Sequence, residues 1–125
     1  MLNKIEQTVF NILKGLNLEV QPQYNIDKYT VDFLVEGKYI IECYGDFWHC
    51  NPQRYTSSYF NKGKRKTAQE IWKRDSERKQ KFEELGYKFM PLWESDIKNN
   101  PPRTLKKKIK TFIQRERKNG HDNDA

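Results

Sequence analysis

The stretch "IIECYGDFWH", from Ile40 to His49, begins as a β-strand and ends in a glycine, two aromatic residues and a histidine. Its β-branched start is typical of a buried strand, yet Glu42 lies in the middle of that strand. A buried carboxylate is costly unless a cation, a proton or a hydrogen-bond donor compensates it. We therefore expect either that this face of the strand is open to water or that a positive group lies beside Glu42.

A second carboxylate, Asp32, belongs to the preceding strand, "YTVDFLV" at residues 29–35. Glu36 and Gly37 turn the chain from this strand into the next, so the two strands are expected to be neighbours. A three-residue connection places Asp32 and Glu42 on one face, whereas a two-residue loop places them on opposite faces. Two like charges directly opposite each other are destabilising unless a cation lies between them. An odd-length turn would thus create a cation site.

The rest of the chain is typical of a short α/β domain without internal repeats. Apolar residues at helical spacing predict a helix over residues 2–16, and Pro22 demotes the weak strand 20–26 towards a sheet edge. The pattern further predicts a long polar loop at 50–66, a helix from Thr67 to Leu85 capped by Gly86, an edge strand at 87–93 and a last helix after "NNPP". Residues 1–118 are then a single domain, and 119–125 a disordered tail.

Positive charge is concentrated in two segments of a chain whose net charge is +7. Lys98 to Lys118 holds nine basic residues and one acidic residue, and Arg54 to Lys66 holds five basic residues and no acid. Such segments favour nucleic acid as the partner, although a solvated helix and a loose loop would show the same charges. The predicted DNA contacts are Arg54, Lys62, Lys64, Arg65, Lys66, Lys106, Lys107, Lys108 and Lys110.

No long apolar run and no signal-peptide pattern is present, so we expect a soluble, cytoplasmic protein without a membrane partner. Cys43 and Cys50 form no CxxC pair and have no second cluster nearby. We expect two free thiols rather than a disulfide framework, and no structural zinc.

Three further side chains are candidates for chemistry, each with an ordinary alternative. Asp75 interrupts the apolar stripe of the second helix, which consists of Ala68, Ile71, Phe82 and Leu85. A pair with Arg78 at i, i+3, or with another arginine, would explain it. Glu6 borders the first helix's apolar face and is, alone, an ordinary boundary glutamate. His49 follows the Glu42 strand at a position where functional loops begin, although a lone histidine is usually a surface or core residue. Carboxylates with a nearby imidazole suit metal-assisted phosphodiester hydrolysis.

In their order along the chain, these motifs are similar to a known group of nucleases. The segments "VDFLV", "YIIECYGDFWH" and "IWKRDSERKQKFEELGYKFMPLWESDI" resemble very short patch repair endonucleases and the homing endonucleases with a Glu-Asp-x-His-Asp site. Both belong to the PD-(D/E)XK superfamily, and the resemblance covers roughly residues 5–97. It implies a restriction-endonuclease-like core, in which helices flank a mixed central sheet, and a bacterial or phage-encoded setting.

The resemblance also implies Mg²⁺-dependent cleavage of double-stranded DNA, with Mn²⁺ as a substitute metal. Asp32 would be a metal ligand and His49 the general base, with Glu6 and Asp75 in supporting roles. Glu42 would match the acidic position of the wider fold, and the backbone carbonyl of Cys43 would be a further ligand. The two aromatic residues before His49 would press into the base stack, as wedges that deform a duplex do; these are Phe47 and Trp48.

The chain departs from the family pattern at three points. Tyr44 stands where the wider fold has a lysine, so that role passes to His49 or is unfilled. Asp46 and Cys50 do not supply the zinc ligands of the repair enzymes. No sequence-reading module is visible, so a partner protein or a further domain could select the target. The alternative function is a non-catalytic DNA-binding domain whose acids only form internal ion pairs; RNA is a minor alternative, since no aromatic RNA-binding sheet motif is visible.

Overall fold

A mixed sheet with the strand order β1-β2-β3-β6 lies at the centre of the computed structural model, which describes residues 1–124 and the side chains of residues 1–118. Its strands are β1 (Val20–Ile26), β2 (Tyr29–Val35), β3 (Tyr39–Tyr44) and β6 (Lys88–Trp93). The first three strands are antiparallel, and β6 is parallel to β3. The helices are α1 (Lys4–Gly15), α2 (Ala68–Glu84), α3 (Glu94–Asn99) and α4 (Pro102–Asp124). The predicted mixed sheet with flanking helices is confirmed.

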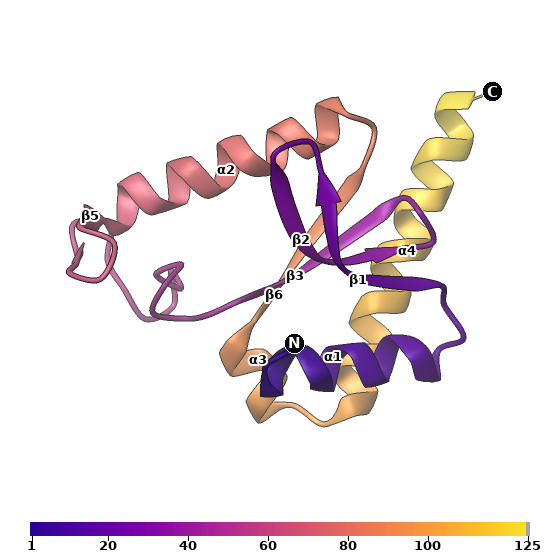
Figure 1. Cartoon of the computed structure of the whole chain (residues 1–125), viewed down its shortest axis with the longest axis horizontal. Helices are drawn as coiled ribbons and strands as arrows, with labels where there is room; N and C mark the ends of the chain where they lie inside the picture. The colour runs from indigo at the N-terminus through magenta and orange to yellow at the C-terminus, as the bar shows by residue number, and fades with distance from the viewer. Residues whose placement is uncertain (125) are drawn as a thin grey trace.

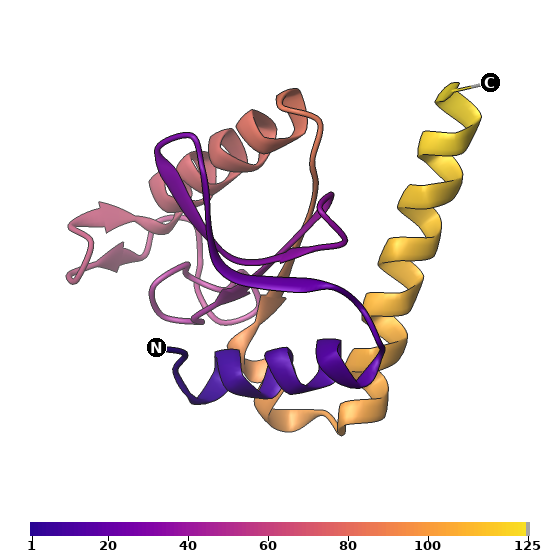
Figure 2. The same cartoon turned by 45° about the vertical axis from the view of Figure 1, so that its right-hand side comes forward.

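The helices cover the two faces of the sheet unequally. Helix α2 packs on one face, where Phe82 meets Leu34, Ile40 and Phe89. Helices α1, α3 and α4 cover the other face, and α4 runs along its far side (Figures 1 and 2). The core of this second face contains apolar residues of all three helices, among them Leu13, Ile97, Leu105, Ile109 and Phe112. Side chains of alternating strand positions therefore point either towards α2 or towards α1 and α4.

The turn between β2 and β3 has the odd length that the sequence argument required. Val35 pairs with Tyr39, so residues 36–38 form a three-residue connection. Glu36 and Gly37 both adopt positive φ, at 54° and 67°, in the left-handed region that glycine tolerates best. The same register pairs Phe33 with Ile41, which brings the next residues, Asp32 and Glu42, to adjacent positions where the pairing ends.

Local signals placed the second helix and the sheet edges correctly. Thr67 caps α2 in a capping box with Glu70, and Gly86 follows the helix with φ at 96°. The two strands that contain proline within the strand, β1 with Pro22 and β6 with Pro91, are the outer strands of the sheet.

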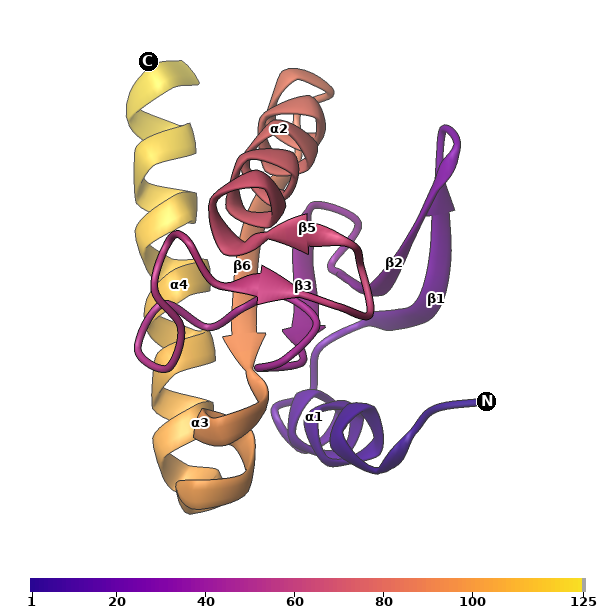
Figure 3. The ribbon, with the colours of Figure 1, turned by 90° about the vertical axis from the view of Figure 1, so that its left-hand side faces the viewer.

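Three details differ from the expectation. The loop at 50–66 contains a short hairpin of β4 (Phe60–Asn61) and β5 (Lys66–Thr67), which Figure 3 shows in front of β3 and β6 and below α2. Helix α3 was not predicted, because its six residues carry too little periodicity. Leu85, expected in the buried stripe of α2, is exposed at the helix end. The tail expected to be disordered, 119–125, lies outside the residues described with their side chains. Over the described residues, every helix is too short or too polar to cross a lipid bilayer.

Candidate active site

His49 lies at the centre of the candidate site, fixed on two sides. Its Nδ1 is 2.8 Å from Oδ2 of Asp75 on α2. Its ring stacks on that of Tyr44, with centroids 3.9 Å apart and planes 2° from parallel. An ionised carboxylate only accepts hydrogen bonds, so Nδ1 is the donor and the neutral ring keeps Nε2 free as an acceptor. The structure thus brings together His49 and Asp75, and it gives Tyr44 a packing role.

The turn that carries His49 is built by short hydrogen bonds. The His49 amide donates to the carbonyl of Gly45 at 3.0 Å. The indole Nε1 of Trp72 on α2 donates to the carbonyl of Cys50 at 2.6 Å. On the other side, Oδ1 of the buried Asp46 accepts from Nδ2 of Asn51 at 3.0 Å. These contacts fix the turn between β3 and α2, so the imidazole position is set by the fold.

Glu42 has the positive neighbour that its burial requires, and this neighbour is Arg78. Arg78 donates from Nη2 and Nε to the same Oε1 of Glu42, at 2.7 and 3.2 Å. Burial raises the pKa of Glu42, while the hydrogen bond and charge of Arg78 oppose that rise. The pairing of Asp75 with Arg78, considered from their spacing along α2, is therefore not formed, since Asp75 contacts His49.

Asp32 contacts the amide of Cys43 and lies near the carboxyl of Glu6. Its Oδ2 accepts a hydrogen bond from the Cys43 amide at 2.8 Å. Burial raises the pKa of Asp32 to about 7, opposed by this hydrogen bond and reinforced by the negative charges of Glu42 and Glu6. Glu6 also closes the capping box of α1, where its Oε1 accepts from the Asn3 amide at 2.9 Å. Glu6 therefore combines an ordinary capping role with a place beside Asp32.

The carboxyl groups of Asp32 and Glu6 suit a hard divalent cation. Glu6 lies close enough to Asp32 for its negative charge to raise the pKa of Asp32, although burial is the largest cause. A cation would relieve this repulsion, and Mg²⁺ commonly binds one or two carboxylates and keeps several waters. Among the described residues, no group of three or more His, Cys, Asp or Glu side chains is placed to hold a metal ion. The expected cation between Asp32 and Glu42 stays a prediction.

Two clefts meet at His49, and Lys64 lines both of them. The first, of about 630 Å³, lies beside α2 and is lined by Glu42, Asp75, Arg74 and Arg78 in addition. The second, of about 640 Å³, lies between the start of α1 and the His49 turn, and Trp48 and Cys43 contribute to its wall. A phosphate near His49 would therefore have a lysine within the same cleft.

The predicted aromatic wedge is exposed and rests on the β4-β5 hairpin. Phe47 and Trp48 are 37% and 52% exposed, and their rings meet edge to face. The Trp48 ring lies so close to Gly63 that a Cβ there would be 2.7 Å from Cζ3. Nδ2 of the buried Asn61 donates to the Phe47 carbonyl at 2.7 Å, which ties the hairpin to this turn.

The predicted basic contacts fall into two separate groups. One group lies on the β4-β5 hairpin beside the clefts and consists of Lys62, Lys64, Arg65 and Lys66. Arg54 precedes this hairpin, and its Nε lies 3.7 Å from Oδ2 of Asp46. The other four lysines belong to α4, which covers the sheet face opposite α2, as the two core clusters and Figure 1 show. Those four are Lys106, Lys107, Lys108 and Lys110.

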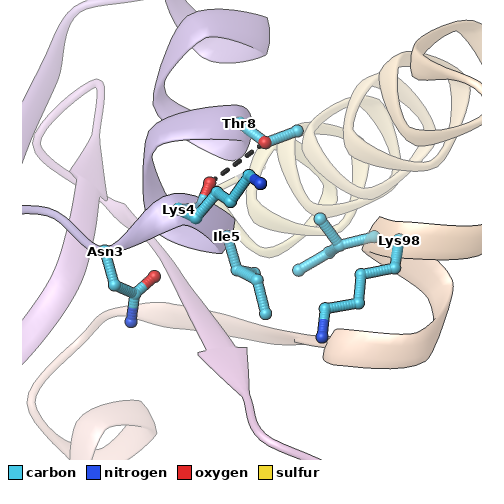
Figure 4. Close-up of a pocket in the computed structure, with 6 residues that line it drawn as sticks. Asn3, Lys4, Ile5, Thr8 and Lys98 are labelled. Carbon is cyan, nitrogen blue, oxygen red and sulfur yellow. Dashed lines mark hydrogen bonds between the residues drawn. The ribbon is translucent and has the colours of Figure 1, made fainter.

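A third cavity, of about 570 Å³, lies between α1 and α3 (Figure 4). Asn3, Lys4, Ile5, Thr8 and Lys98 line it, and Oγ1 of Thr8 donates to the Lys4 carbonyl at 3.1 Å. Its lining includes no carboxylate or imidazole side chain, so it offers no groups for hydrolysis.

Two residues that build the site, Trp72 and Asn61, were missed from the sequence, and Arg78 was considered only as a partner of Asp75. All three act through partners far away along the chain, which a local pattern does not reveal. Asn61 offered one signal, since asparagine and glycine are common turn residues and Asn61 lies two residues before Gly63. Cys43 and Cys50 are free thiols, as expected.

Comparisons with known proteins support the fold. No protein-family model matches the chain, and no curated protein matches it. Among solved structures, the fold is similar to the "Homing Endonuclease I-Bth0305I Catalytic Domain", with a TM-score of 0.61 and 15% identity. The match covers 89% of this chain and 94% of that domain. The chain therefore has the fold of a homing endonuclease catalytic domain.

Proposed function

We propose that the protein is a metal-dependent endonuclease that hydrolyses phosphodiester bonds in double-stranded DNA. The observation that carries this proposal is the His49 imidazole, which is oriented by Asp75, stacked on Tyr44 and exposed to two clefts that share Lys64. A binding domain has no need of an oriented imidazole in a cleft, whereas hydrolysis needs a group that takes a proton from water. The similarity to a homing endonuclease catalytic domain supports the same function.

In this proposal, His49 is the general base. Nε2 of the neutral ring accepts the proton of the attacking water, and the Asp75 carboxylate stabilises the imidazolium that forms. Stacking on Tyr44 restricts rotation of the ring, so Nε2 keeps one direction. Lys64 binds the phosphate, and Arg74 adds positive charge to the α2 side of the cleft.

Asp32 and Glu6 would hold the divalent metal, with the backbone carbonyl of Cys43 as a further ligand. A bound Mg²⁺ would lower the pKa of its water and stabilise negative charge on the phosphate. Before it can bind a cation, Asp32 must lose its proton, so its raised pKa places metal binding near neutral pH. Glu42 takes less part in this arrangement, because Arg78 already occupies one of its oxygens.

A non-catalytic DNA-binding domain is the second candidate, and one observation favours it. In a binding domain, the acidic residues would have structural roles only. Two of them do have such roles, since Glu42 forms an internal ion pair with Arg78 and Glu6 closes the cap of α1. A DNA-binding function does not, however, explain why Asp75 orients the His49 ring.

Plasmid nicking in Mg²⁺ and in EDTA separates the two functions. We expect the protein to nick supercoiled plasmid in Mg²⁺, and to lose this activity in EDTA and in the His49→Ala variant. Binding of the plasmid without nicking, at saturating Mg²⁺ and pH above 7, would favour the binding domain. An assay with Mn²⁺ in place of Mg²⁺ is the positive control, because carboxylate and carbonyl ligands also bind Mn²⁺ and it can occupy a site that binds Mg²⁺ weakly.

A further inference from the structure

We propose that α4 is a second DNA-binding surface, which contacts a duplex segment separate from the one bound at His49. The observation is a stripe of exposed basic side chains on α4, the helix that covers the sheet face opposite α2 (Figures 1 and 2). This proposal depends on the proposed function in one respect, namely that the first duplex segment is the one cleaved at His49. The members of the stripe are Arg103, Lys106, Lys107, Lys110, Arg117 and Lys118.

Helical geometry places these six residues on one side of α4. Successive residues turn by roughly 100°, so positions 103, 106, 107, 110, 117 and 118 fall within about a third of the helix circumference. Three of the buried residues, Leu105, Ile109 and Phe112, fall on the opposite side, and the fourth, Ile113, lies at the edge of the stripe. All six basic residues are exposed, and the stripe extends for roughly 22 Å at ~1.5 Å per residue.

The positive charges of the stripe repel one another and destabilise the helix. Its first turn has no acidic residue, and Arg103 places a positive charge near the helix end whose dipole already repels cations. Arg103 and Lys107, and Lys106 and Lys110, are like-charged pairs at i, i+4, which destabilise a helix. Among the ion pairs of the described side chains, only Arg117 of the stripe has an acidic partner, Glu36 at 3.8 Å. A polyanion would relieve this repulsion.

The chemistry of the stripe favours the backbone of a duplex. It carries no aromatic side chain, so it offers no stacking surface for the bases of single-stranded nucleic acid. The residues between its charges include Gln114 and no exposed apolar side chain. The apolar side of α4 is already buried in the protein core, so no apolar face is left to insert into a membrane surface. Lysines and arginines along a line match regularly spaced phosphates without reading sequence.

One straight duplex cannot contact both basic surfaces. The β4-β5 hairpin and α4 lie on opposite sides of the molecule, with the sheet between them (Figures 1 and 3). Two helix layers of ~10 Å diameter and the sheet separate the stripe from the outer side of α2. DNA is stiff over ~150 base pairs, so wrapping one short duplex around the domain would be costly. The surfaces therefore suit two segments, of one long DNA or of two molecules.

The test is the number of duplexes bound per chain, measured by sedimentation velocity at low salt with a duplex of about 20 base pairs in excess. We expect two duplexes for the wild type and one for the α4 variant Lys106→Ala/Lys107→Ala/Lys110→Ala. The hairpin variant Lys62→Ala/Lys64→Ala/Arg65→Ala should also bind one duplex, but with weakened nicking. As a matched control, Lys14→Ala/Lys79→Ala/Lys81→Ala removes three exposed charges elsewhere and should still bind two.

A wild type that binds one duplex overturns the proposal. So does an α4 variant that still binds two, which would assign the stripe to another partner such as an acidic protein. An α4 variant whose nicking falls together with its binding would show that both surfaces share one duplex. If the wild type does not nick DNA at all, the proposed function fails, whereas the duplex count still decides the role of α4.

Discussion

Arg78 and Glu42 form an ion pair that joins α2 to β3 beneath the candidate site. Two guanidinium nitrogens of Arg78 contact one oxygen of Glu42, and Nη2 also donates to the Thr30 carbonyl at 3.1 Å. The guanidinium lies over the rings of Tyr29 and Phe82, at 5.1 and 5.0 Å from their centroids. Both side chains are largely buried, so each needs the other to compensate its desolvation.

Replacing Arg78 by Met should destabilise the fold strongly, because it leaves Glu42 buried without its cation. We expect the free energy of unfolding to fall by about 2–4 kcal/mol in urea titrations at neutral pH. The double variant Glu42→Gln/Arg78→Met should recover part of that loss, since the amide carries no charge to desolvate. A single variant as stable as the wild type would show that solvent, and not Arg78, compensates Glu42.

This pair also shows where prediction from the sequence stops. From the sequence, Glu42 required either open water or a positive group beside it, and a bound cation or an arginine would satisfy the second alternative equally. Periodicity and caps placed α2 to within a residue or two, but they could not show that Asp75 faces His49 while Arg78 faces Glu42. Both choices depend on the packing of α2 against β3, which is a tertiary contact between distant segments.

Register, by contrast, was predictable because it follows from a small number of alternatives. The turn after Val35 had to have an odd length for Asp32 and Glu42 to lie next to each other, and it does. The direction of the Asp32 carboxyl was not predictable, because it depends on the free amide of Cys43 and on the approach of α1. The β4-β5 hairpin was hidden by its short strands, which carry too few residues for a period to show.

Stability should fall as the pH rises from about 4 to about 7, because of Asp32. Burial raises its pKa to about 7 in the folded state, whereas an unfolded aspartate has a pKa of ~3.9. Between these values the folded state holds a proton that the unfolded state has lost, so raising the pH favours unfolding. Below the window both states are protonated, and above it the loss is complete. Thermal melts of the metal-free protein between pH 4 and 8 measure this effect, which Asp32→Asn should reduce.

Divalent metal should reverse the effect of Asp32 at the upper end of that window. Only the ionised carboxylate binds a cation, so the rise in Tm caused by Mg²⁺ or Mn²⁺ should grow as the pH increases through about 7. Asp32→Asn should abolish the rise at every pH. A metal-induced shift of equal size at pH 5 and pH 8 would place the metal elsewhere.

Gly63 should control the position of Trp48. An alanine Cβ would lie 2.7 Å from Cζ3 and 3.0 Å from Cη2 of the indole, so the half-exposed ring must move in Gly63→Ala. We expect a cost in stability under about 1 kcal/mol, a change in tryptophan fluorescence and weaker binding of duplex DNA. Gly15→Ala is the matched control, because nothing lies within 4 Å of its added Cβ. Unchanged DNA affinity in Gly63→Ala would remove Trp48 from the interface.

The interaction of His49 with Asp75 should matter for catalysis and little for folding. We expect His49→Ala to lower the nicking rate by a factor on the order of 10²–10⁴, the usual contribution of a positioned base. Asp75→Asn should have a similar effect, because an amide can donate to Nδ1 and so favour the tautomer that lacks a free acceptor at Nε2. Since the two residues act as one unit, the double variant should be little worse than either single variant. Added imidazole should restore part of the rate in His49→Ala and none in Asp75→Asn, where the ring still fills the site. If His49 only packs against Tyr44, His49→Ala should instead lower Tm and leave the specific activity of the folded protein intact.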